Sequence, residues 1–184
     1  MLTAKNREKR EFLLSEFKLT MIGLPFFILI SSTVALYIWV WGSEPLLWGL
    51  SRFFSFVCIP IVLMGLFLNE FFFRLTLAIL GKFPMSKFWY GFNLNQLMKC
   101  GDREIPAGIS YFRLAMVIPH AILGLFPLVL GLSINYPSVF IFGYLFTLAS
   151  IGDITLLWES RHVKSTVGVS EHPTREGILL IEEE

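Results

Sequence analysis

Long apolar runs alternate with short charged clusters along the chain, and the runs are long enough to cross a bilayer. A transmembrane helix needs about 20 predominantly apolar residues. Such stretches cover residues 19–41, 46–80, 114–134 and 136–158. The second is longer than a straight span requires, so we expect a tilted helix or one that extends beyond the lipid. The pattern does not decide whether this stretch is one helix or two.

Both ends of the chain are more polar than these runs. The segment EKREFLLSEFK places Phe12, Leu13 and Phe17 at helical spacing among charges. It is either an amphipathic helix on the membrane surface or the solvated start of the first span. The tail contains GILLI, a candidate short strand, before its acidic end. We therefore expect an amphipathic N-terminal segment (1–18), a transmembrane domain (19–158) with a loop at 82–112, and a polar tail (159–184).

Composition agrees with the hydrophobic pattern. Of the 184 residues, 55% are hydrophobic, and the mean hydropathy of +0.67 is typical of membrane proteins. The predicted fold is therefore an all-α, polytopic membrane protein with about four transmembrane helices. A net charge of +1 gives no basis for nucleic-acid binding. The expected partners are the lipid bilayer and other membrane protein subunits.

Basic residues predict the orientation of the spans. Five lie within residues 1–18, six within 74–113 and three after 158, whereas Arg52 alone lies near the opposite face. Cytoplasmic segments are enriched in Lys and Arg. With four spans, the three groups share one side, so both termini and the 82–112 loop are expected in the cytoplasm.

Polar residues interrupt the second apolar stretch. On a helix, Asn69 and Phe73 lie one turn apart on the same face, with Glu70 beside them. The zinc-protease motif H-E-x-x-H has this geometry, with two His ligands and a Glu base. Here the sequence is NEFFF, so the glutamate is present and both histidines are replaced.

Three further segments extend the match: YFRLAMVIPHAILGLFPLVLGL at 111–132, ASIGDITLL at 149–157 and VSEHPTREGILLI at 169–181. With NEFFF, they make the chain resemble a bacterial family of small four-helix membrane proteins, the zincin-like metallopeptidases. The resemblance implies a bacterial inner-membrane location. It also places Glu70 at the general-base position, Asp153 at a third metal ligand, and Glu171, His172 and Pro173 in the family's tail motif.

The departure from the motif predicts a pseudo-protease. Asn is a poor zinc ligand, Phe offers the metal nothing, and catalytic zinc normally has three protein ligands. We therefore expect no cofactor and no catalytic residues at the degenerate positions Asn69, Glu70, Phe73 and Asp153. Instead, Arg74 would neutralise a buried ionic cluster with Glu70 and Asp153. In its simplest role, this cluster only fastens the second span to the fourth.

Three functions remain open from the sequence. The first is a non-catalytic binding or assembly subunit of a membrane complex. The second is a metallopeptidase whose rearranged zinc site uses Asp153, Glu70 and His120. The third is a proton or ion pathway through Glu70, Arg74 and Asp153. His120 is either such a metal ligand or a neutral histidine that donates to a backbone carbonyl freed by Pro119.

Overall fold

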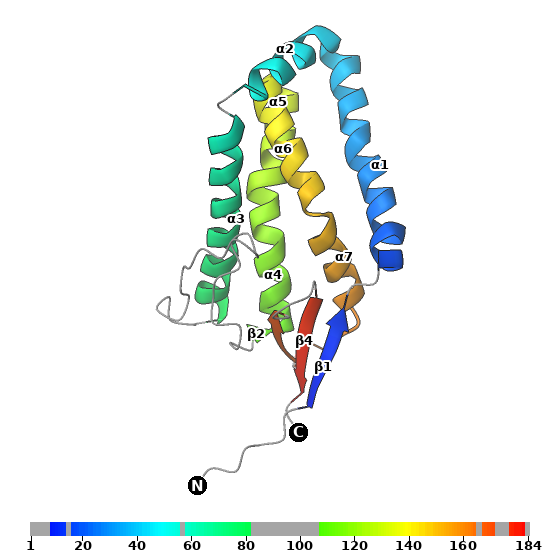
Figure 1. Cartoon of the computed structure of the whole chain (residues 1–184), viewed down its shortest axis with the longest axis vertical. Coiled ribbons are helices and arrows are strands. Elements are labelled where there is room, and N and C mark those ends of the chain that lie inside the picture. The colour runs from blue at the N-terminus through cyan, green and yellow to red at the C-terminus, as the bar shows by residue number, and fades with distance from the viewer. Residues whose placement is uncertain are drawn as a thin grey trace.

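A helical bundle stands on a small β-sheet in the computed structural model, which describes residues 8–13, 16–55, 58–81, 107–164, 167–171 and 177–182 (Figure 1). The first and the last described strands both belong to this sheet. In chain order the elements are β1 (Glu8–Leu13), α1 (Glu16–Trp41), α2 (Ser43–Phe53), α3 (Cys58–Gly81), β2 (Ala107–Gly108), α4 (Ile109–His120), the π-helical turn η2 (Ala121–Leu125), α5 (Phe126–Ser133), α6 (Pro137–Ala149), α7 (Ile151–Ser160), β3 (Gly168–Glu171) and β4 (Gly177–Glu182).

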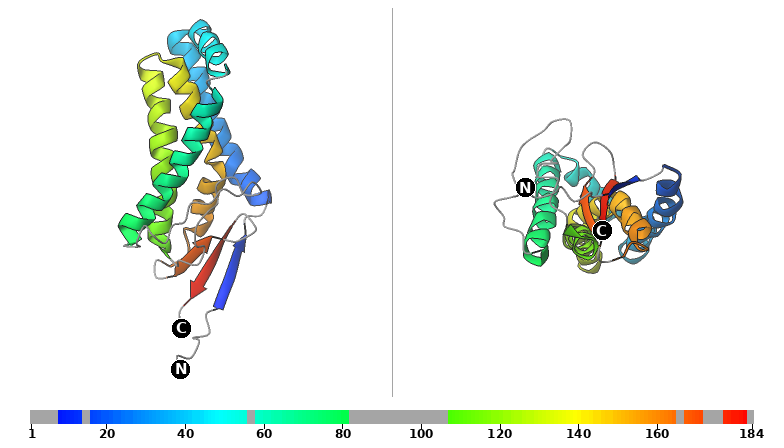
Figure 2. Two further views of the ribbon diagram at one scale, coloured as in Figure 1. Left: turned by 60° about the vertical axis from the view of Figure 1, so that its left-hand side comes forward. Right: turned by 90° about the horizontal axis from the view of Figure 1, so that it is seen from below.

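The bundle confirms the predicted all-α, multi-pass membrane fold. Three helical stretches are long and apolar enough to span a membrane: Leu19–Trp41, Cys58–Gly81 and Ile109–Ser133. The pair α6 and α7, bent by 42°, makes a fourth if it is one span. Seen from below, α3 and α1 lie on opposite sides, with α4 and α7 between them (Figure 2).

The amphipathic helix expected in the N-terminal segment is wrong for residues 8–13, which form strand β1. This strand pairs antiparallel with β4, from Glu8 opposite Glu182 to Leu13 opposite Gly177. The strand suggested for the tail is confirmed as β4, and the sheet order is β1-β4-β3-β2. Pairing with a strand distant in sequence overrides the local helical spacing, because β-structure depends strongly on its context.

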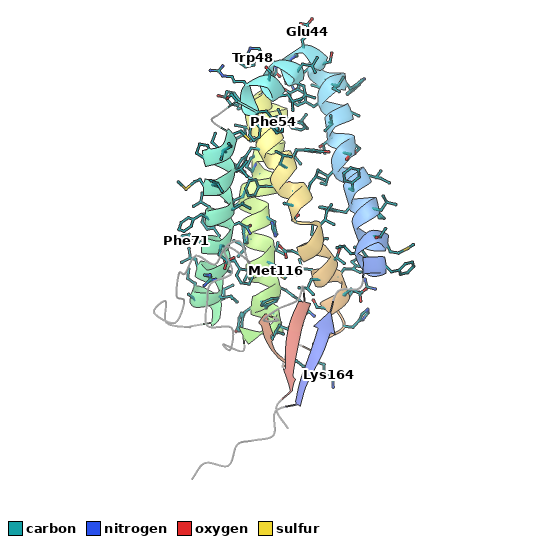
Figure 3. All side chains as sticks on the ribbon, viewed as in Figure 1. Glu44, Trp48, Phe54, Phe71, Met116 and Lys164 are labelled. Carbon is teal, nitrogen blue, oxygen red and sulfur yellow. The ribbon has the colours of Figure 1, made fainter. Side chains whose placement is uncertain are left out.

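The second apolar stretch forms two helices, α2 and α3, which answers the question that the hydrophobic pattern left open. Gly42 turns the chain after α1 with a φ of 84°, which glycine adopts without steric cost. Helix α2 then lies across the end of the bundle (Figure 1). Its residues Glu44 and Trp48 lie at this end, far from Lys164 near the sheet (Figure 3). Lying across the end keeps Arg52 out of the hydrocarbon, where a charge is costly.

The third stretch begins earlier than predicted. Residues 107 and 108 form β2 and α4 starts at Ile109, so the expected loop cannot extend to 112. The rest of that loop, residues 82–106, lies outside the described residues. The helix then passes through η2 between Pro119 and Pro127. Prolines remove backbone hydrogen bonds from a helix, which favours such irregular turns.

The two larger apolar clusters of the described residues fill the bundle at different levels. At the α2 end, helices α5 and α6 pack closely around a cluster of Tyr37, Phe53, Leu128, Phe140 and Ile141. At the sheet end, a second cluster joins α4, α7 and β3; its members are Ile109, Phe112, Met116, Leu156 and Val169. The polar residues singled out from the sequence lie on α3, α4 and α7.

Candidate functional site

Glu70 and Arg74 form an ion pair within α3, as the sequence predicted. The Glu70 Oε1 atom lies 2.5 Å from Arg74 Nη2 and accepts a hydrogen bond from Arg74 Nε at 2.7 Å. Their spacing of four residues places both side chains on one helix face. The Arg74 side chain is 7% exposed and that of Glu70 is 26% exposed. The glutamate at the general-base position is therefore already bound by a cation.

Phe73, at the second histidine position of the motif, packs in the contact between α3 and α4. Its ring meets that of Phe112 edge to face, with ring centroids 5.7 Å apart. It also packs against Leu77 and Ala115. Phe73 thus contributes apolar packing where a metalloprotease would place a ligand.

Asn69, at the first histidine position, is partly buried. Its Oδ1 atom is buried without a hydrogen-bond partner among the described residues. Buried polar atoms are nearly always hydrogen-bonded, so this oxygen is an acceptor that no donor among the described residues reaches.

Asp153 pairs with His120, a residue that the sequence had placed beside it only in the alternative of a rearranged zinc site. The Asp153 Oδ2 atom lies 2.5 Å from His120 Nε2. The predicted cluster of Glu70, Arg74 and Asp153 is therefore seen as two separate pairs, one within α3 and one between α4 and α7. Among the described residues, Asp153 contacts His120 of the third span, so the expectation that Asp153 fastens the second span to the fourth is corrected.

The alternatives for His120 are resolved in part. Its Nε2 atom faces a carboxylate, so the predicted donation to a backbone carbonyl is not seen. Its Nδ1 atom is buried without a hydrogen-bond partner in the described part of the chain. With Nε2–H donated to the carboxylate, Nδ1 in a neutral ring is an acceptor. The α4–α7 contact thus leaves one histidine nitrogen available.

Arg113 makes a second polar contact between α4 and α7. Its Nη2 atom donates to the backbone carbonyl oxygens of Ser160 and, at 3.2 Å, Val163. Arg113 and His120 are seven residues apart on α4, as are Asp153 and Ser160 on α7. These four residues, here called the α4–α7 seam, align two antiparallel helices through matched contacts two turns apart. The seven-residue spacing was a sequence signal for Arg113 that our reasoning missed.

These residues do not fit a catalytic zinc ion. Such an ion requires three protein ligands. The described residues contain no group of three or more His, Cys, Asp or Glu side chains that could hold a metal. Of the rearranged set Asp153, Glu70 and His120, the structure brings two together, and the third is bound to Arg74.

The tail motif can be placed only in part. Glu171 ends strand β3, which pairs with β4 on one side and β2 on the other. His172 and Pro173 lie outside the described residues, so the role expected for them stays a prediction.

Comparisons with known proteins add no assignment. A scan against protein-family models, a search of curated proteins and a search of solved structures found no match. The resemblance to the zincin-like family therefore stays a prediction.

Proposed function

We propose that this multi-pass membrane protein is a non-catalytic, zincin-like binding or assembly subunit of a membrane complex. One observation carries the proposal: at two of the motif positions, those of Glu70 and Phe73, the side chains already make contacts that hold the fold together. Glu70 is bound by Arg74 at 2.5 Å, and Phe73 packs edge to face on Phe112. A general base needs a free carboxylate near a metal-bound water. Glu70 is instead held in an ion pair, and the described residues place no group of three metal ligands around it.

The exposed surface of the helices supports binding within the membrane. Large apolar side chains are exposed along the candidate spans; examples on α1 and α3 are Leu24, Ile28, Leu29, Ile59 and Met64. Lipid or other membrane helices suit such a surface. The sheet end carries Arg113, Arg161 and Lys164, so the positive-inside rule supports a cytoplasmic sheet end in a bacterial inner membrane.

Metal content of the purified protein tests the proposal. The full chain is extracted in mild detergent without chelator, and zinc is measured by mass spectrometry beside an Asp153→Ala control. We expect zinc at background in both samples. Near-stoichiometric zinc that disappears in the control would make the rearranged metallopeptidase the better hypothesis.

A proton pathway is a second candidate, favoured by the pair His120–Asp153. A half-exposed carboxylate touches a largely buried histidine whose other nitrogen has no partner among the described residues. Chains of such groups carry protons in membrane proteins. Proteoliposomes with an internal pH-sensitive dye test it: a proton flux abolished by Asp153→Asn would favour the pathway. A flux equal to that of protein-free liposomes would reject it.

A further inference from the structure

Asp153 is a half-exposed carboxylate inside a candidate span. Its side chain is 43% exposed. It lies eight residues before Arg161, which is roughly 12 Å along a helix with a rise of 1.5 Å per residue. The Arg161 guanidinium stacks on the Trp158 ring at 3.9 Å, and tryptophan beside a basic residue is typical of the membrane interface. Asp153 therefore lies at hydrocarbon depth.

His120 meets only part of the bonding capacity of this carboxylate. An ionised carboxylate has about four acceptor sites on its two oxygens. Within the described part of the chain, the hydrogen bond of Asp153 is the one to His120. Acidic side chains at this depth are costly, and they usually pair with another residue. The exposed part of Asp153 therefore favours a cationic neighbour from outside the chain.

The helix surface beside Asp153 is open at Gly152. A Cβ atom built on Gly152 would meet no heavy atom within 4 Å, whereas one on Gly23 would lie 2.8 Å from the Ile151 side chain. Small residues with open space above them allow membrane helices to approach closely. Gly152 thus offers room for a second helix next to the carboxylate.

We propose that Gly152 and Asp153 form a docking point for a transmembrane helix of a partner protein that carries Lys or Arg. The basic residue would lie about eight residues from the cytoplasmic end of that helix, level with Asp153. Charge complementarity selects this partner chemistry, because a lipid tail or an apolar helix leaves the carboxylate unpaired. The inference rests on the proposed function, since it names the kind of partner that the binding subunit holds.

Model helices test the docking point directly. Two 23-residue Leu/Ala peptides are compared, one with Lys eight residues from its cytoplasmic end and one with Leu there. Association with the labelled full-length protein is measured by energy transfer in phosphatidylcholine vesicles. We expect the Lys peptide to bind about fivefold more tightly, as a single polar contact between membrane helices allows.

Matched variants locate the contact. Asp153→Asn and Gly152→Leu should each reduce the Lys peptide to the affinity of the Leu peptide, while Glu44→Gln at the α2 end should change nothing. Thermal melts of all variants exclude a loss of fold as the cause. Equal binding of the two peptides to the native chain, or a preference that survives both substitutions at the docking point, would overturn the proposal.

Water accessibility provides a second readout. In a Cys58→Ser, Cys100→Ser background, Asp153→Cys should react slowly with a membrane-impermeant thiol reagent, because docking of a second helix requires this position to face lipid. Rapid labelling would show that the position opens to water and would overturn helix docking. The zinc measurement is independent of both readouts: background zinc with no peptide preference removes the docking point alone, whereas bound zinc removes the proposed function.

Discussion

The two ends of the bundle are held together by different chemistry. At the α2 end, α5 and α6 meet through glycines: a Cβ atom on Gly143 would overlap the backbone nitrogen of Leu128, and one on Gly131 would overlap Phe140. At the sheet end, α4 and α7 meet through the polar side chains of the α4–α7 seam, in addition to the apolar cluster that joins them. Backbone contact leaves no space for other groups, whereas in the seam His120 and Asp153 keep hydrogen-bonding positions that no described residue fills.

This difference indicates which end of the bundle can carry a functional site. Close glycine contacts are typical of structural helix packing in membranes. Polar side chains at membrane depth are costly and usually mark function or internal pairing. The α2 end therefore serves as the rigid part of the bundle, and the sheet end carries the candidate site.

Replacing Gly143 should have the largest effect. Gly143→Ala introduces a Cβ atom into the backbone of η2 and α5, near Leu128 N and, at 2.7 Å, Gly124 O. We expect the free energy of unfolding to fall by about 3 kcal/mol, the upper range for overpacking. Unfolding by SDS in mixed micelles measures it. A loss below that of the seam variants would contradict the rigid role of this end.

Breaking the Arg113 contact of the seam should reduce the free energy of unfolding by less than Gly143→Ala does. Arg113→Gln removes charged hydrogen bonds to the carbonyl oxygens of Ser160 and Val163. We expect a loss of about 2 kcal/mol, typical of hydrogen bonds that involve a charged group. Hydrogen exchange at the end of α7 should rise at the same time. Arg161→Gln, which changes an exposed arginine, is the control and should have little effect.

The second contact of the seam, between His120 and Asp153, should contribute less to the free energy of unfolding than the Arg113 contact does. A double-mutant cycle with His120→Gln and Asp153→Asn isolates the interaction between the two side chains. We expect a coupling energy of about 1 kcal/mol, near the values found for polar contacts between membrane helices. Additive effects of the two substitutions would show that the 2.5 Å contact carries no net energy.

The smallest effect should have the opposite sign. Gly152→Ala fills open space on α7 and reduces the freedom of the unfolded chain. We expect a gain of about 0.5 kcal/mol. A glycine-to-alanine substitution should therefore have opposite effects on stability at the two ends: it destabilises the fold at Gly143 and stabilises it at Gly152. A destabilised Gly152→Ala variant would show that the surface beside Asp153 is already filled.

The sequence predicted the membrane-spanning fold because apolar length alone identifies spans. It also placed Glu70 beside Arg74, since a spacing of four residues defines neighbours on any helix. It could not place Asp153 against His120, because this contact depends on how α4 and α7 align. The pairing of β1 with β4 could not be predicted either, because the two strands lie at opposite ends of the chain.

The Glu70–Arg74 pair tests the central claim most directly, because it asks whether the glutamate at the general-base position serves structure. Arg74→Ala leaves a largely buried carboxylate without its cation, so we expect the free energy of unfolding to fall by about 3 kcal/mol. Adding Glu70→Gln removes that charge and should restore part of the loss. A double variant as unstable as Arg74→Ala alone would contradict the claim that the ion pair fixes Glu70 in a structural role.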